Sequence, residues 1–117
     1  MDLQFEEHDG ICVARTSEFE LGADCADELR SALLGKMEEN PWCCLDLSTI
    51  TFMDSSALGV LVACLKAARG KGGFHLFGVQ PRIDELFRLT GLRRVFACHE
   101  DEATCLASMR AARERAA

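Results

Sequence analysis

Three consecutive polar residues, Asp54, Ser55 and Ser56, stand between a strand-like segment and a very apolar segment. Asp and Ser are favoured at the N-cap of a helix. The first backbone N–H groups of a helix have no partner within it, and the positive end of the helix dipole lies there. A serine hydroxyl at this point is well placed to carry a phosphate. No Glu or Gln follows either serine by three residues, so a capping box is absent; simple capping and phosphorylation both stay open.

A phosphate on one of these serines would act as an electrostatic switch. It would add a charge of about −1.5 to −2 beside Asp54. The helix dipole would tolerate this charge, so the fold need not change. A partner that docks at this point would meet a new, strongly hydrated anion, and its binding would change by local electrostatics.

The segment after the serines is predicted to be a helix with little polar surface. Every residue from 57 to 65 is Ala, Leu, Gly, Val or Cys, and one stripe at helical spacing consists of Leu58, Leu61, Val62 and Leu65. A surface helix usually keeps its outer face polar, so this helix is either buried on more than one side or docks a partner. Gly59 costs such a helix about 1 kcal/mol relative to alanine. Close packing against a sheet or close approach of a partner's backbone would explain it.

The hydrophobic pattern along the chain predicts alternating strands and helices. Asp9-Gly10 is a hairpin signal, Asp24 is a plausible N-cap, and Pro81 suits the first turn of a helix. We expect strands at 3–8, 11–16, 42–47, 74–79 and 95–98, and helices at 25–36, 55–69, 81–90 and 100–113. The alternation after residue 40 implies parallel pairing with right-handed crossovers. The prediction is an α/β fold in one domain, residues 1–117 with a core at about 3–113, in which a small mixed β-sheet is packed with about four α-helices.

The composition is that of a globular protein with no sign of nucleic-acid or membrane binding. The 117 residues are 49% hydrophobic and 27% charged, and the formal net charge is −6. Nucleic-acid binding usually needs a basic face. The longest uncharged apolar run, residues 57–65, is much shorter than the roughly 18 residues that span a bilayer, and the N-terminus has no signal-peptide pattern. We expect a cytoplasmic protein that binds neither nucleic acid nor membrane.

The cysteines and histidines form no recognisable catalytic or metal-binding motif. The seven cysteines are odd in number and have no C-x-x-C pair; reduced, buried thiols are the main interpretation, and a redox or metal role is the alternative. A serine hydrolase needs a base beside its nucleophile, yet His8, His75 and His99 occur in separate segments. The glycine-rich run 70–73 lacks the phosphate-loop and dinucleotide patterns. The sequence therefore predicts neither an enzyme nor a cofactor or metal site.

Two stretches of the chain resemble the STAS-domain family of anti-sigma factor antagonists, also called anti-anti-sigma factors. The stretch from Leu45 to Leu61 contains Asp-Leu-Ser-x-Ile-x-Phe-Met-Asp-Ser-Ser-x-Leu-Gly-Val-Leu. The stretch 72–96 contains Gly-Gly-Phe-His-Leu-Phe-Gly-Val and Leu-Phe-Arg-Leu-Thr-Gly-Leu-Arg-Arg-Val-Phe. The resemblance extends over roughly residues 3–113. The family's fold, a small mixed sheet with helices packed on it, agrees with the element order above.

The resemblance implies a bacterial regulator of transcription that works by partner switching. Members of the family bind an anti-sigma factor that is also a serine kinase of the GHKL type, and so free a sigma factor. Phosphorylation releases the kinase, and a PP2C-type phosphatase restores the binding form. Carried over to this chain, the phosphoacceptor is Ser56, with Ser55 second. The residues expected at the partner-binding surface are Asp54, Ala57, Leu58, Gly59 and Val62.

One residue departs from the family pattern. Members usually have glycine after the second serine, and this chain has Ala57. If the kinase requires the absence of a side chain there, phosphorylation would be weakened. The alternative function is therefore a non-phosphorylated STAS subunit of another regulatory, signalling or lipid-transport complex. For either function we expect a monomer or a weak dimer.

Overall fold

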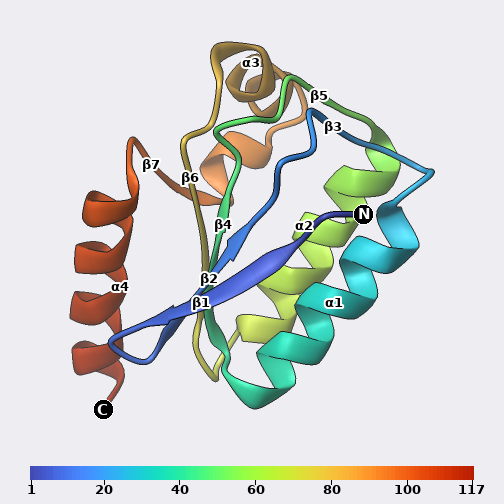
Figure 1. Ribbon diagram of the computed structural model, residues 1–117. Helices are drawn as coiled ribbons and strands as arrows, with labels where there is room; N and C mark the ends of the chain where they lie inside the picture. The colour runs from blue at the N-terminus through green and yellow to red at the C-terminus, as the bar shows by residue number, and fades with distance from the viewer.

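The computed structural model describes residues 1–117, and its centre is a five-stranded mixed sheet with helices on both faces (Figure 1). The strand order is β1-β2-β4-β6-β7, with bounds Gln4–His8, Ile11–Arg15, Trp42–Asp46, Gly73–Phe77 and Ala97–His99. β1 pairs antiparallel with β2, and the other neighbours pair in parallel. The predicted α/β fold with a small mixed sheet is thus confirmed.

The antiparallel pair closes through the predicted two-residue turn. His8 and Ile11 face each other at the end of the β1–β2 ladder. Asp9 has φ of 54° and Gly10 has φ of 78°. Two positive φ values in succession are typical of the turn whose twist matches that of the strands it joins. The Asp-Gly pair is therefore used here for its tolerance of the left-handed region.

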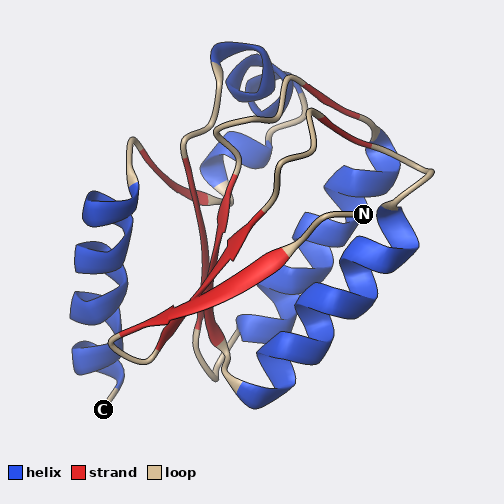
Figure 2. Cartoon of the chain, viewed as in Figure 1, coloured by secondary structure: helices blue, strands red, loops and turns tan.

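Four α-helices cover the sheet unequally (Figure 2). α1 (Ala26–Glu39) and α2 (Ser55–Ala68) lie side by side on one face, and α4 (Glu102–Ala116) covers the other. α3 (Pro81–Leu89) lies at one end of the sheet, at the top of Figure 1. A core cluster of 24 buried residues fills the larger side, and a second of 7 residues packs under α4. Side chains alternate between the two clusters along the strands, as Cys43 and Cys44 do.

A second, two-stranded sheet was not predicted. β3 (Glu20–Leu21) pairs in parallel with β5 (Phe52–Met53). Strands of two residues are too short to produce an alternation pattern, so the sequence carries no local signal for them. Thr51 donates its backbone N–H to Phe19 O at 2.8 Å, which extends the contact. This small sheet holds the segment before α1 against the start of α2.

Three local predictions need correction. The N-cap of α1 is Cys25 and not Asp24, because Cys25 N–H first closes a turn onto Gly22 O at 3.0 Å. The short final strand lies at Ala97–His99, since a 3-10 turn, η1 (Leu92–Arg94), occupies the residues just before it. α4 continues to Ala116, beyond the expected end.

Most cysteines are buried, as the sequence predicted. Six of the seven lie in the core, and Cys98 on β7 is exposed. All seven are free thiols. Cys12 on β2 and Cys43 on β4 pack on the side of α1 and α2, and Cys44 packs on the side of α4. These thiols act there as small apolar side chains. None of the helices has both the length and the apolar character that crossing a membrane requires.

Candidate functional site

Asp54 caps α2 and does so without help from either serine. Its backbone is extended, with φ of −100° and ψ of −178°. Its Oδ1 accepts hydrogen bonds from Ser56 N at 2.9 Å and Ala57 N at 3.2 Å. These bonds, together with one from Ala23 N, stabilise the carboxylate and hold the pKa of Asp54 below its usual value. Because Asp54 satisfies the helix start, the hydroxyls of Ser55 and Ser56 have no capping role.

The other oxygen of Asp54 holds the chain before α1 in place. Oδ2 accepts from Ala23 N at 2.9 Å. A Cβ at Gly22 would lie 2.9 Å from this oxygen and 3.4 Å from Asp24 Oδ1. Only glycine therefore allows the turn to approach Asp54 so closely. The sequence contained no signal for this contact, because residues 22 and 54 are brought together by the β3–β5 pair.

The first two turns of α2 have one exposed face and one buried face. We call the exposed residues the serine face: Ser55, Ser56, Gly59 and the half-buried Val62. A Cβ at Gly59 would meet no atom within 4 Å, so close packing against the sheet does not explain this glycine. Ala57 is fully buried and Leu58 is 9% exposed. Both side chains therefore pack into the core, whereas Gly59 and Val62, also expected at the partner-binding surface, lie on the serine face.

Exposed apolar side chains occur before β3, on β5 and at the end of α3. Phe52 on β5 is 49% exposed, Phe19 is 69% exposed and Leu89 at the end of α3 is 70% exposed. A groove of about 250 Å³ between β5 and α3 is lined by residues that include Phe52, Arg82 and Leu89. Met53, also in its wall, directly precedes Asp54. Exposed apolar surface with a polar rim is typical of protein-interaction sites.

The wall of the groove contains both Arg82 and Glu85, whereas the segment that contacts the start of α2 carries acidic residues. Glu20 on β3 and Asp24 before α1 are exposed, and the ionised Asp54 lies between them and the serines. A surface of this kind attracts a basic partner surface. A phosphate on a serine would deepen the negative potential at the centre of the surface.

The histidines lie away from the serines. His8 on β1 contacts Glu6 Oε1 at 2.9 Å. His75 on β6 and His99 on β7 contact each other, with 3.0 Å between His75 Nδ1 and His99 Nε2. Burial lowers the pKa of His75 to about 4 and also lowers that of His99, so both rings are neutral near pH 7. Sequence reasoning missed this pair, because the two residues are 24 positions apart.

Comparisons with known proteins give a consistent result. The family model for the STAS domain matches residues 2–105. An anti-sigma F factor antagonist of Paenibacillus polymyxa is 27% identical over 112 residues, which cover 93% of this chain and 95% of that protein. An anti-sigma-B factor antagonist of Listeria monocytogenes is 35% identical over 75 residues, which cover 62% and 66%. The crystal structure of an anti-sigma factor antagonist from Mycobacterium paratuberculosis aligns with a TM-score of 0.84 at 27% identity and 92% coverage of each chain.

Proposed function

Because this chain belongs to the STAS domain family, as its match over residues 2–105 shows, we propose that it is an anti-sigma factor antagonist. The named relatives from Paenibacillus and Listeria support this assignment. They also support a regulatory binding protein over an enzyme. Its partner would be an anti-sigma factor, and binding would free a sigma factor for transcription. Because a sigma factor works with RNA polymerase, the protein would act in the cytoplasm.

The observation that carries the proposal is the exposed Ser56 beside a carboxylate that already caps the helix. Ser56 is free for a partner or a kinase because Asp54 Oδ1 supplies the cap. Without phosphate the serine face is small and neutral, so a partner's backbone can approach along Gly59. A phosphate on Ser56 would place about −1.5 to −2 charges at the same point and disfavour that approach. Ser55, also exposed, is the second candidate acceptor.

The direction of the Ala57 side chain supports phosphorylation despite the departure from the family pattern. Its methyl group is fully buried. A side chain that points into the core presents nothing to an approaching kinase. The observation that favoured a non-phosphorylated subunit therefore loses its weight, and we retain Ser56 as the acceptor.

The surface chemistry supports a partner with apolar and basic character. The groove beside Phe52 and Leu89 offers apolar area, and the exposed Glu20 and Asp24 favour positive charge opposite them. We propose that the partner is an anti-sigma factor and serine kinase of the GHKL type. A PP2C-type phosphatase would reverse the modification. The antagonist itself would be a monomer or a weak dimer.

A phosphomimetic exchange tests the proposal. Phosphosite mapping by mass spectrometry on protein from growing and stressed native cells would identify the acceptor and the partner that copurifies. Ser56→Asp is then expected to keep the wild-type circular dichroism spectrum and to lose binding to that partner by tenfold or more. Ser56→Ala, which removes the hydroxyl without adding charge, is the matched control and should bind the partner, and Ser55→Asp shows whether charge at the second candidate acceptor has the same effect. A folded Ser56→Asp variant that binds normally, with no phosphate on Ser56 in any condition, would favour the constitutive subunit instead.

A further inference from the structure

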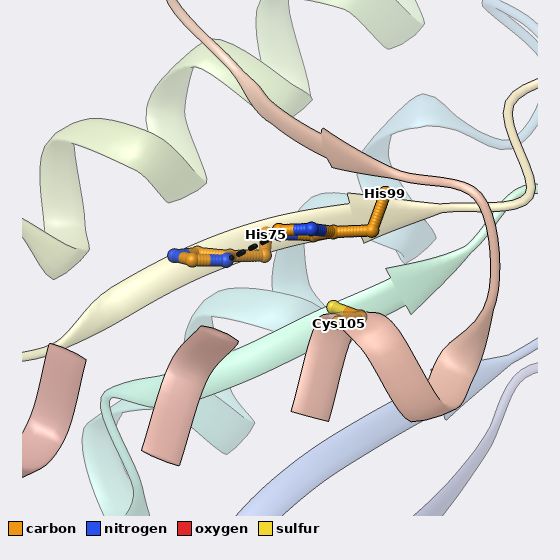
Figure 3. Close-up of side chains that lie close together, drawn as sticks. All are labelled: His75, His99 and Cys105. Carbon is orange, nitrogen blue, oxygen red and sulfur yellow. Dashed lines mark hydrogen bonds between the residues drawn. The ribbon is translucent and has the colours of Figure 1, made fainter. Parts of the chain in front are cut away.

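Three side chains of the types that ligate metals converge on the α4 side of the sheet, outside the serine motif. His75 comes from β6, His99 from the end of β7 and Cys105 from the first turn of α4. Figure 3 shows the two imidazole rings edge to edge, with Cys105 beside them. The parallel register pairs Phe77 with His99 and His75 with Ala97. Both histidines therefore point to the same face of the sheet, the face that α4 covers.

We propose that His75, His99 and Cys105 bind one transition-metal ion of the class that takes nitrogen and sulfur ligands, Zn²⁺ or Cu⁺. One ligand atom from each residue lies within 4.8 Å of the other two, and His75 Nδ1 is 3.0 Å from His99 Nε2. Tetrahedral bonds of the usual Zn–N and Zn–S lengths require about 3.3 Å between two nitrogens and about 3.5 Å between nitrogen and sulfur. The nitrogens are already within a few tenths of an ångström of this spacing, and the sulfur, within 4.8 Å of both, has to move closer by no more than about 1.3 Å.

The hydrogen bond between the imidazoles occupies the place that the ion would take. One ring nitrogen now donates its proton to the other. On metal binding, the donor ring moves that proton to its other nitrogen, so that both facing nitrogens offer lone pairs. The Cys105 thiol releases a proton to solvent and binds as the thiolate. No electron is transferred, and one proton is released for each ion bound.

The surroundings favour a soft or borderline ion and allow it to enter. The ligand set contains no carboxylate, and Mg²⁺ and Ca²⁺ prefer oxygen ligands. Met109 Sδ lies 3.9 Å from Cys105 Sγ, so a thioether stands beside the thiol; thioethers and thiolates select Cu⁺ and similar ions. His75 and His99 are only half-buried, whereas Cys105 is fully buried. An ion would therefore reach the thiol from the side of the two rings.

Metal titration of the tag-free, full-length protein tests the site. After chelator treatment and dialysis, the protein is titrated with Zn²⁺ by calorimetry, with Cu⁺ against a chromogenic chelator, and with Co²⁺ by absorption spectroscopy. The expected result is one equivalent of Zn²⁺ or Cu⁺, and a thiolate-to-cobalt charge-transfer band with Co²⁺. His99→Gln and Cys105→Ser are each expected to weaken metal binding by more than about 100-fold. Loss of a residue that only supports a metal ligand usually weakens binding by about 10- to 100-fold.

The chain supplies matched controls for both variants. His8→Gln removes a histidine of another strand, and Cys98→Ser removes the exposed thiol of β7; both are expected to bind like the wild type. If Cys105→Ser unfolds because its site is buried, the half-buried His99→Gln still decides the question. The proposal would be overturned if neither Zn²⁺ nor Cu⁺ bound at one equivalent. Equal affinity of the wild type and His99→Gln for the ion would overturn it as well. Neither outcome bears on the serine face, because none of its residues takes part.

Discussion

Two substitutions in α2, Ala57→Gly and Gly59→Ala, are expected to change the free energy of unfolding in opposite directions. Ala57→Gly removes a fully buried methyl group, a loss of about 0.8 kcal/mol. It also places glycine in the helix, a loss of up to about 1 kcal/mol. Together they lower the free energy of unfolding by about 1.5–2 kcal/mol. Gly59→Ala adds a methyl group that meets no atom within 4 Å, so it raises the free energy of unfolding by about 0.5–1 kcal/mol.

Urea unfolding at neutral pH, followed by far-ultraviolet circular dichroism, measures both changes. With a slope of about 1–3 kcal/mol/M for a small domain, Ala57→Gly lowers the midpoint by roughly 1 M, and Gly59→Ala raises it by a smaller amount. The slopes should change very little, because one methyl group is a very small part of the area that unfolding exposes. Ala57→Gly is also expected to leave partner binding and Ser56 phosphorylation unchanged, since the methyl group does not reach the surface.

Gly35→Ala on α1 is the matched control for the serine face. Gly35 is exposed within a helix, and a Cβ there also meets no atom within 4 Å. It should stabilise the protein as Gly59→Ala does, but only Gly59→Ala should weaken partner binding. An Ala57→Gly variant as stable as the wild type would refute the inward placement of the methyl group. A destabilised Gly59→Ala variant would refute the free space assigned to position 59.

Two further expectations concern the core and the cap of α2. Leu61→Ala, at a fully buried position, should lower the free energy of unfolding by about 2–5 kcal/mol in the same urea assay; a loss below 1 kcal/mol would contradict its core placement. Folding lowers the pKa of Asp54 from its usual value of 3.8. The ionised carboxylate therefore stabilises the folded state at pH values above 3.8, and this stabilisation is lost as the pH falls through the folded-state pKa. The stability difference between wild type and Asp54→Asn should therefore narrow between pH 7 and pH 3 in thermal melts, and a difference independent of pH would contradict the role of the carboxylate.

Several features of this protein were predictable because they depend on neighbours within a few residues of the chain. Asp9-Gly10 closes a hairpin because two positive φ values favour these residue types. Asp54 caps α2 through its own side chain and the N–H groups two and three residues later. Pro81 starts α3, where its missing N–H is not needed. The order of strands and helices followed from such signals, and so did the position of the serines at a helix start.

The parts that required the tertiary structure are contacts between segments far apart in the chain. The Gly22–Asp54 approach, the burial of Ala57 and the exposure of Gly59 all depend on how β3, α1 and the sheet meet α2. Residue spacing cannot encode such contacts, because a crossover between parallel strands has no fixed length. His75, His99 and Cys105 are therefore unremarkable in sequence. They become one cluster only where two neighbouring strands and α4 meet.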